Sequence, residues 1–378
     1  MTLNNIIKEF DRCIKCGLCL ATCPICKELL LEKYTPRGKI QLAKFYTQGE
    51  LDLSDHYWDI FAKCLLCGAC STTCPSGVDL KRVLLNVREE IANQKGLHPR
   101  MVEILKSLYT KRNISDFDNT KRGEWRDFLD DLPDHMYQKD KAEVVYFVGC
   151  VASFFPMVQP IPEKFVQILE IANADFSILA EEEWCCGFPL IAAGIPEKMK
   201  ELIVHNLTKV KSLEAKTVVF SCPSCYTIWK KYYNTDLELL HTTQFIEKLI
   251  DARAIPLGEL NIRVTYHDPC DLGRNSGIYD APRTILKSIP GLTLVELENR
   301  KAQSICCGGG GNIQMIDTAL SGSLAQKKIR EIQETNVNIV VTSCQQCVRI
   351  IKGGARIQNI DLKVMDITEL VLQSMSSV

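Results

Sequence analysis

Nineteen cysteines are the feature of this 378-residue sequence that could do chemistry, and ten of them form one motif that occurs twice. The motif is a lone cysteine, then Cys-Cys-Gly, then Cys-x2-Cys. The intervening gaps are 34 and 35 residues in the first copy and 35 and 36 in the second. The members are Cys150, Cys185, Cys186, Cys222 and Cys225, then Cys270, Cys306, Cys307, Cys344 and Cys347. This internal repeat predicts one structural unit built twice, in which five thiols converge.

Eight further cysteines form a second motif, Cys-x2-Cys-x2-Cys-x3-Cys-Pro, which also occurs twice. This spacing is typical of the bacterial ferredoxin run for a [4Fe–4S] cluster, in which the fourth cysteine ligates the other cluster. The predicted ligand sets are Cys13, Cys16, Cys19 and Cys74 for one cluster, and Cys64, Cys67, Cys70 and Cys23 for the other. Zinc competes for sulfur sites, but structural zinc sites more often use two separated Cys-x2-Cys pairs.

Composition limits the other uses of these thiols. Disulfide frameworks suit small secreted domains, whereas this chain is large and begins without the basic and apolar regions of a signal peptide. The net charge of −1 gives no electrostatic reason to bind nucleic acid. No apolar run approaches the roughly 18 residues that span a bilayer. We expect a cytoplasmic protein, with attachment to the inner face of the membrane only through a partner. Cys26 belongs to neither motif, and we expect it to be a buried spare thiol.

Short apolar, β-branched runs lead into four of the cysteine positions and predict buried strands. They are residues 144–148, 217–220, 264–266 and 339–342. Ligands of open α/β sheets bind at the carboxyl ends of the strands, so these cysteines are expected at the binding edge. The two Cys-Cys-Gly triplets fall in predicted loops. The second continues as Gly308 to Gly311, and we interpret these glycines as letting the backbone approach a bulky inorganic group.

The fold class that follows is α/β. A helical two-cluster ferredoxin-like domain (residues 1–96) precedes a linker (97–142) and two repeated α/β domains (143–258 and 259–378). The linker is rich in charged residues, but its aromatic side chains predict that it lies across a domain or partner surface. They are Phe117, Trp125, Phe128 and Tyr137. Apolar patterning predicts helices at residues 78–93, 160–172, 197–215, 281–288, 313–335 and 367–375.

The double five-cysteine motif resembles the cysteine-rich CCG domain of heterodisulfide reductases. The whole layout is similar to the D subunit of heterodisulfide reductase and to the iron–sulfur subunits of glycolate oxidase and lactate-utilisation systems. It is also similar to the C subunit of anaerobic glycerol-3-phosphate dehydrogenase. The resemblance implies that each complete motif holds a noncubane [4Fe–4S] cluster through its five cysteines. One or two such clusters are expected beside the two cubane clusters, and zinc in one repeat stays an alternative.

One position departs from the family pattern. A histidine often follows the first cysteine of the second motif in the family, whereas this sequence has Asp271. A histidine there would suit proton delivery at physiological pH, and a carboxylate would need a raised pKa. Nearby His267 and Asp268 are the other candidates for catalytic or supporting roles. Structural turn residues are the alternative interpretation of these two.

The resemblance implies an electron-transfer subunit of an FAD-linked 2-hydroxy acid dehydrogenase acting on glycolate or lactate. The chain shows no Gly-rich dinucleotide fingerprint after a strand, so the FAD is expected on a partner protein, with a further electron acceptor or donor protein. The alternative is a heterodisulfide-reductase-like catalytic subunit that reduces a disulfide at a noncubane cluster. A quinone-reducing anchor subunit is a third possibility. Whether the chain is itself an enzyme is left open.

Overall fold

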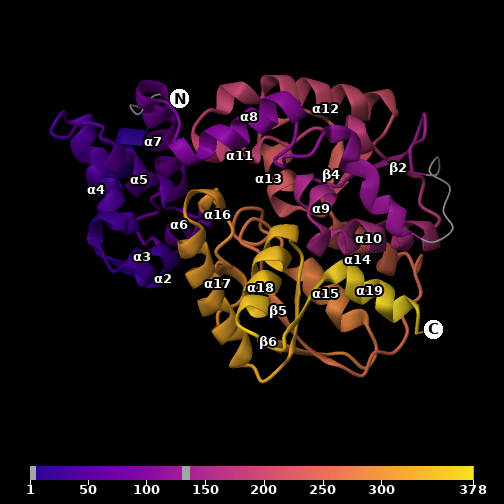
Figure 1. The fold of residues 1–378 in the computed structure, drawn as a ribbon. Helices are drawn as coiled ribbons and strands as arrows, with labels where there is room; N and C mark the ends of the chain where they lie inside the picture. Colours follow the sequence, from indigo (N-terminus) through magenta and orange to yellow (C-terminus); the bar gives the residue numbers. More distant parts are fainter. Residues whose placement is uncertain (1–5, 130–136, 378) are drawn as a thin grey trace.

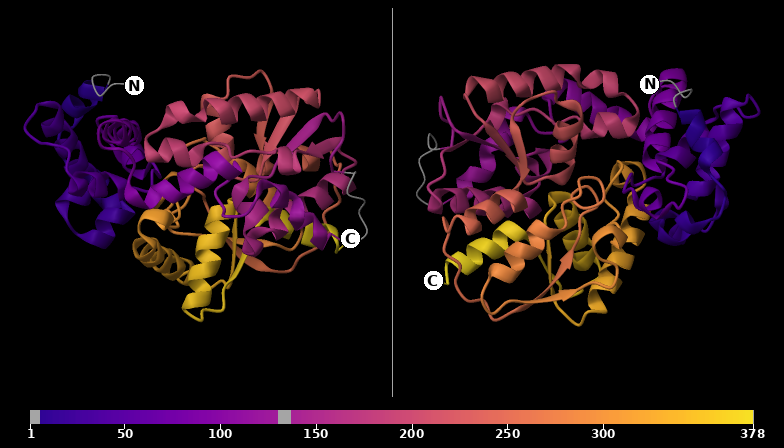
Figure 2. Two further views of the ribbon diagram at one scale, coloured as in Figure 1. Left: turned by 45° about the horizontal axis from the view of Figure 1, so that its top comes forward. Right: turned by 180° about the vertical axis from the view of Figure 1, so that it is seen from behind.

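The computed structural model describes residues 6–129 and 137–377. Figure 1 shows a helical body from the N-terminal quarter of the chain beside two α/β bodies, one from the middle of the chain and one from its end. The helical body stays at one end of the molecule in the two further views (Figure 2). None of the described helices is both long and apolar enough to cross a bilayer.

The helical body carries both ferredoxin-type motifs. Its helices are α1 (Ile7–Arg12), α2 (Leu18–Thr22), α3 (Pro24–Leu29), α4 (Pro36–Thr47), α5 (Asp55–Ala62), α6 (Ala69–Thr73) and α7 (Leu80–Lys95). The start of α4 is fixed by Thr35, whose hydroxyl accepts a hydrogen bond from Gly38 N at 2.9 Å, with Pro36 at the first position. Cys19 and Cys70 lie in the short helices α2 and α6, and the other six cysteines of the two motifs lie in the turns around them.

A middle segment leads from the helical body onto the first α/β body. It contains η3 (Pro99–Met101), α8 (Val102–Lys111) and the 3₁₀ helix η4 (Asn119–Phe128). Trp125 and Tyr137 are buried, whereas Phe117 is exposed. The side chain of Phe128 lies outside the described residues.

The first repeat is a parallel sheet with the order β2-β1-β3-β4. Its strands are β1 (Val144–Phe147), β2 (Phe176–Ile178), β3 (Thr217–Phe220) and β4 (Glu238–His241). Its helices are α9 (Cys150–Phe154), α10 (Pro160–Ile171), α11 (Phe188–Ala193), α12 (Lys200–Ser212), α13 (Pro223–Tyr232) and α14 (Thr242–Asp251). This order belongs to the doubly wound class, whose switch point lies between β1 and β3.

The second repeat has the same topology, with the order β6-β5-β7-β8. Its strands are β5 (Arg263–His267), β6 (Thr293–Glu296), β7 (Ile339–Thr342) and β8 (Lys363–Asp366). Its helices are α15 (Asp280–Ser288), α16 (Ile313–Ile316), α17 (Thr318–Gln333), α18 (Gln345–Ile357) and α19 (Ile367–Met375). Short 3₁₀ turns complete the chain: η2 (Glu32–Tyr34), η6 (Pro156–Val158), η7 (Ala180–Glu182), η8 (Pro196–Met199) and η9 (Lys301–Gln303).

The predicted α/β class with two repeated parallel sheets is confirmed, and one predicted helix is wrong. The single helix expected over residues 313–335 is two helices that break at Asp317. The Asp317 carboxylate accepts a hydrogen bond from Leu320 N at 3.0 Å and so caps α17. A side chain that competes for backbone donors in this way starts a new helix instead of continuing the old one.

The two repeats share an apolar core. Helices α10 and α14 of the first repeat pack against α19 and α15 of the second, respectively. Phe165 and Ile246 from one side join Ile285 and Leu370 from the other in one buried cluster. The helix before the second strand of each repeat packs against the helix after the fourth strand of the other, and this reciprocal arrangement resembles a two-fold pairing of the repeats.

Arg88, in the middle of α7, joins the helical body to both repeats. Its guanidinium is fully buried and donates five hydrogen bonds to main-chain carbonyls over 2.7–3.2 Å. The acceptors are the carbonyl oxygens of Phe61, Ala62, Cys64, Ala192 and Gly311. Three of these carbonyls lie in the last turns of α5 and α11, where helix carbonyls lack partners and carry negative partial charge.

Replacing Arg88 with Met should lower the free energy of unfolding by about 3–5 kcal/mol, because buried carbonyls lose their donors. Chemical denaturation under anaerobic conditions, followed by circular dichroism, measures this change. Lys95→Met is the control on the same helix, because Lys95 forms only a surface pair with the exposed Asp55; its effect should stay within about 0.5 kcal/mol. Equal effects of the two variants would contradict the role of Arg88.

Candidate metal centres

Two small thiol-lined cavities lie in the helical body. Cys13, Cys16, Cys19 and Cys74 line one of them, which we call the outer site. Cys23, Cys64, Cys67 and Cys70 line the other, which we call the inner site. The structure thus brings together the same two sets of four that the sequence predicts as ligand sets. Cys26 lines neither cavity, and it is partly exposed, so the expectation that it is buried is wrong.

The two sites differ in their exposure to solvent. Cys16 of the outer site is exposed, and it is flanked by the exposed side chains of Ile14 (68%) and Leu18 (51%). At the inner site, Cys67 is buried. Burial raises the pKa of Cys23 to about 12. A metal ion that binds there must therefore displace the thiol proton.

Two buried cations lie beside the inner site. Lys39 lines its cavity, is only 2% exposed and donates to the carbonyl of Lys63 at 2.5 Å. Arg88 donates to the carbonyl of Cys64 at 2.9 Å. Neither cation forms an ion pair with a carboxylate of the described chain. The two cations therefore favour the binding of a negatively charged group at the inner site.

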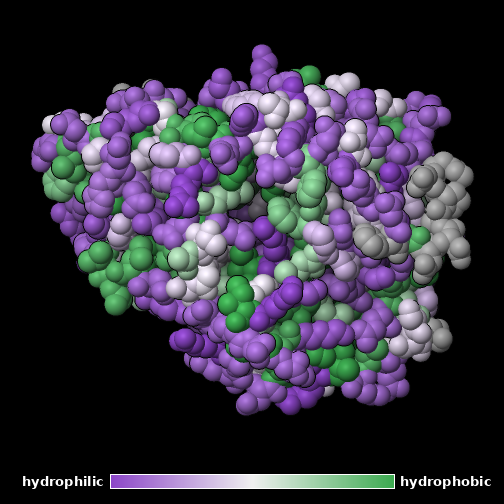
Figure 3. All heavy atoms as spheres, in the orientation of Figure 1, coloured by the Kyte–Doolittle hydropathy of each residue, from purple (hydrophilic) through white to green (hydrophobic). Residues whose placement is uncertain are grey.

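The ten cysteines of the two repeats line one common cavity of about 430 Å³, which we call the ten-thiol cavity. The sequence predicted five thiols converging in each repeat, and the structure places both groups on the same space. The molecular face in Figure 3 is hollowed near its centre, where the three bodies meet. Cys150 and Cys222 follow the central strands β1 and β3 at the switch point, and Cys270 and Cys344 follow β5 and β7 in the same way.

The Cys-x2-Cys pairs occupy helix N-termini. Cys222 is the N-cap residue of α13, and Cys225 lies in its first turn. Cys344 and Cys347 stand in the same positions of α18. A helix N-terminus carries positive partial charge and favours the thiolate form of cysteine, which is the form that binds metal.

The first repeat holds its lone cysteine with a buried ion pair. Arg122 donates to Cys150 Sγ at 3.3 Å and to Glu183 Oε1 at 2.6 Å. Glu183 in turn accepts hydrogen bonds from Val148 N and Gly149 N, at 2.7 and 2.9 Å. Arg122 comes from η4, within the segment treated as a linker, and the sequence did not identify it. The one feature of the sequence that pointed to this segment was its aromatic side chains, from which we expected it to lie across a domain or partner surface.

The three polar candidates of the second repeat lie in different surroundings. Asp268 pairs with both terminal nitrogens of Arg283 at 2.8 Å and also accepts from Lys301 N. Asp271 accepts from Ser224 Oγ at 2.6 Å and from Asn275 Nδ2 at 2.5 Å, and it lies 3.7 Å from Lys81 Nζ. Both carboxylates are therefore already engaged.

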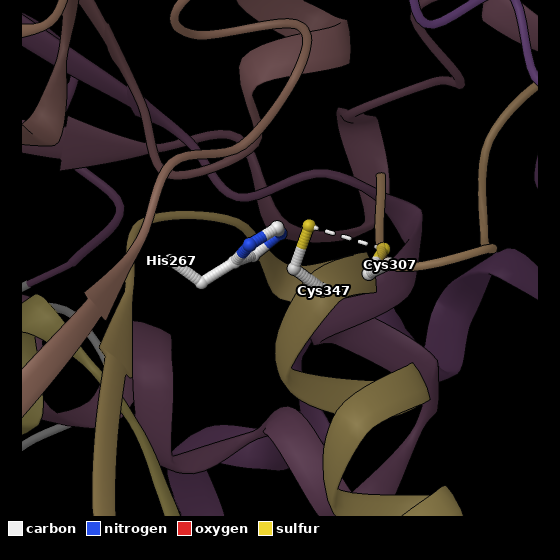
Figure 4. A group of neighbouring side chains, drawn as sticks. All are labelled: His267, Cys307 and Cys347. Carbon is white, nitrogen blue, oxygen red and sulfur yellow. Dashed lines mark hydrogen bonds between the residues drawn. The ribbon is translucent and has the colours of Figure 1, made fainter. Parts of the chain in front are cut away.

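His267 is the third candidate, and it is fully buried beside two of the thiols (Figure 4). Its ring nitrogens and the sulfurs of Cys307 and Cys347 can supply donor atoms that all lie within 4.8 Å of one another. The two sulfurs are 3.3 Å apart. These three side chains could hold a metal ion.

The inner site directly adjoins the second repeat. An interaction between the thiols of Cys67 and Cys306 lowers the pKa of Cys67 to about 6. Arg274 reinforces this contact by donating to the Cys67 carbonyl at 2.8 Å. The glycine run packs on the same loop, because a Cβ at Gly310 would lie 2.5 Å from the Leu65 carbonyl oxygen. The glycines thus allow close approach of protein backbone, while Gly309 and Gly310 also line the ten-thiol cavity, so the predicted approach to an inorganic group stays a prediction.

Comparison with known proteins identifies the family. The model of the cysteine-rich CCG domain matches residues 144–229 and 264–352, and that of the 4Fe-4S dicluster domain matches residues 9–78. The D subunit of dihydromethanophenazine:CoB–CoM heterodisulfide reductase from Methanosarcina barkeri is 30% identical over 98% of this chain and 95% of its own length. The chain belongs to the CCG-domain iron–sulfur proteins that include this heterodisulfide reductase component.

Other CCG-domain relatives are also named as oxidoreductases or their components. The B subunit of fumarate reductase (CoM/CoB) from Methanothermobacter marburgensis is 28% identical over 96% of this chain and 72% of the relative. EtfAB:quinone oxidoreductase of Syntrophomonas wolfei is 27% identical over 85% of this chain and 47% of the relative. A crystal structure of a hypothetical protein from Helicobacter pylori shares the fold, with a TM-score of 0.62 and 10% identity over 99% of this chain and 76% of that one.

The donor sets fit the iron–sulfur clusters of the CCG-domain family. Two groups of four thiols and one cavity with ten thiols are what cluster ligation requires, because iron–sulfur clusters are held by cysteine thiolates. The chain is an iron–sulfur electron-transfer subunit. The assignment of individual cysteines as ligands stays a prediction.

Replacing Cys23 with Ser should damage the inner cluster and leave the outer one, although Cys23 belongs to the first motif in the sequence. Electron paramagnetic resonance (EPR) spectra of the dithionite-reduced protein, with iron analysis, measure this loss. Cys26→Ser is the matched control three residues away and should leave both signals intact. Loss of the outer signal instead would mean that the ligand sets do not cross over.

Replacing Lys39 with Met should shift the inner cluster to a more negative reduction potential, because a buried positive charge that favours the reduced cluster is removed. Redox titration monitored by EPR measures both cubane potentials in one sample. Arg37→Met is the control: Arg37 lines the outer site, is paired with Glu32 at 2.7 Å and is partly exposed. An inner potential that does not move in Lys39→Met would refute the electrostatic role of Lys39.

Proposed function

We propose that this chain is the cluster-bearing component of an oxidoreductase complex and that it reduces a disulfide in the ten-thiol cavity. The packing of the inner ferredoxin loop against the second repeat carries this proposal. Arg274 donates to the Cys67 carbonyl at 2.8 Å, and Gly310, which lines the ten-thiol cavity, lies against Leu65, which lines the inner site. The full-length similarity to the D subunit of heterodisulfide reductase supports the same substrate class.

The reaction requires a supply of electrons and protons. Two electrons and two protons convert one disulfide into two thiols, so the sulfur–sulfur bond breaks and each sulfur gains a proton. The clusters, when bound, supply one-electron carriers and iron atoms to which sulfur can bind. The outer site faces solvent beside Cys16, so a partner protein would deliver the electrons there.

The proposal includes the domain boundaries, the clusters and a partner. The boundaries are residues 1–96 for the ferredoxin-type domain, 97–142 for the connecting segment, and 143–258 and 259–378 for the CCG domains. One or two noncubane clusters occupy the ten-thiol cavity, with zinc in one repeat as the alternative. The relatives are named as subunits, which supports a partner for this chain and membrane contact only through it.

A second candidate is the electron-transfer subunit of an FAD-linked glycolate or lactate dehydrogenase. The hydrogen bonds of Asp271 favour this candidate. Asp271 stands where the family often has histidine, and its carboxylate accepts hydrogen bonds from Ser224 and Asn275. A group held in this way is poorly placed to deliver a proton to a leaving thiolate. In this alternative the ten-thiol cavity would pass electrons on without holding a substrate.

Anaerobic purification of the complex from its host separates the two candidates. A bound FAD-containing dehydrogenase with glycolate or lactate activity, and no disulfide reduction, would replace the first proposal by the second. Reduction of a disulfide by the purified complex, with reduced viologen as electron donor, would support the first.

Replacing Cys306 with Ser should abolish disulfide reduction and remove a cluster signal distinct from the two cubane signals, because Cys306 lies where the inner site meets the cavity. Activity with reduced viologen, iron analysis and EPR measure these effects on one preparation. Cys26→Ser should retain both activity and iron. Unchanged iron content and spectra in Cys306→Ser would show that the second repeat binds no iron.

A further inference from the structure

His267 is a buried histidine whose ring nitrogens have no hydrogen-bond partner in the described chain. The side chain is 0% exposed, and both Nδ1 and Nε2 are unpaired. Buried polar groups almost always have partners, so an imidazole left unpaired on both sides calls for a missing one. The nearest donor atoms of matching chemistry are the sulfurs of Cys307 and Cys347 (Figure 4).

The first repeat shows that the fold does not need a histidine here. The residue three positions before the lone cysteine is His267 in the second repeat and Phe147 in the first, and both end the equivalent central strand. Phe147 packs against Phe220 and Trp229, with ring centroids 5.5 and 5.4 Å apart. The apolar ring of Phe147 therefore fills the end of this strand in the first repeat, whereas the second repeat has the imidazole of His267 at the same position.

The other polar neighbours of His267 do not bond to its ring. The carboxylate of the adjacent Asp268 is held by Arg283, and the hydroxyl of Thr342 donates to the carbonyl oxygen of His267, not to its ring. The sulfurs of Cys307 and Cys347 lie 3.3 Å apart, a separation that suits two donors on one centre. Imidazole nitrogen and cysteine sulfur are common joint ligands of iron and zinc.

We propose that His267 is a nitrogen ligand of the metal group in the second repeat, beside Cys307 and Cys347. This proposal rests on the presence of a metal group in that repeat, which is part of the proposed function, but it does not depend on the substrate. It makes the two repeats chemically unequal, because the first has only sulfur donors.

The test uses the full chain, purified anaerobically after labelling of its histidines with ¹⁵N. Electron–nuclear double resonance on the signal that Cys306→Ser removes should show strong ¹⁵N coupling in the wild type. The coupling should disappear in His267→Phe, which carries the residue of the first repeat, and in His267→Cys, which restores a ligand. His205→Phe is the control, because His205 stacks on Trp184 at the surface, and it should leave the coupling unchanged.

The possible outcomes separate this proposal from the proposed function. A wild-type signal without strong ¹⁵N coupling, or coupling that survives in His267→Phe, overturns the ligand role even if a disulfide is reduced. Coupling that is lost in both His267 variants supports it even if no disulfide is reduced. If the second repeat holds zinc, the same comparison is made at the zinc X-ray absorption edge, where His267→Phe must lose the imidazole scattering.

Discussion

The arrangement of the metal centres depends on one buried guanidinium. The guanidinium of Arg88 donates hydrogen bonds to carbonyl oxygens of four segments. They are the end of α5, Cys64 of the inner site, α11 of the first repeat and the glycine run of the second. A cation without a carboxylate partner is costly to bury, and here the negative ends of two helices offset part of the cost. A negatively charged cluster would offset more, so the assembly of the three bodies and the loading of the inner site should support each other.

The duplicated fold has acquired different neighbours for its two sets of thiols. In the first repeat, Arg122 and Glu183 surround Cys150 with a buried ion pair. In the second, Cys306, the counterpart of Cys185, lies beside the inner ferredoxin loop, where Arg274 donates to the Cys67 carbonyl. Gln345 of the second repeat also donates to the Val148 carbonyl of the first at 2.6 Å. The inner site therefore adjoins the ten-thiol cavity on the side of the second repeat.

Short-range patterns in the sequence predicted the parts of the fold that they encode. The β-branched runs before the cysteines indicated the four central strands, and the ferredoxin spacing indicated the two sets of thiols that the structure brings together. The edge strands β4 and β6 are partly exposed and lack a continuous apolar run, so no periodicity marked them. The roles of Arg88 and Arg122 were not predicted, because an arginine is expected at the surface from sequence alone. The carbonyls and carboxylates that bind these two side chains come from distant parts of the chain.

The glycine run has a second neighbour that the sequence did not indicate. A Cβ at Gly311 would lie 2.1 Å from the Cys64 carbonyl oxygen, so these residues also permit a close approach of the inner ferredoxin loop. Any side chain there would push the inner site away from Cys306. The glycines therefore set the separation between the inner site and the ten-thiol cavity, which Gly309 and Gly310 also line. A glycine loop beside cysteine ligands can thus serve the path between clusters as well as a cluster itself.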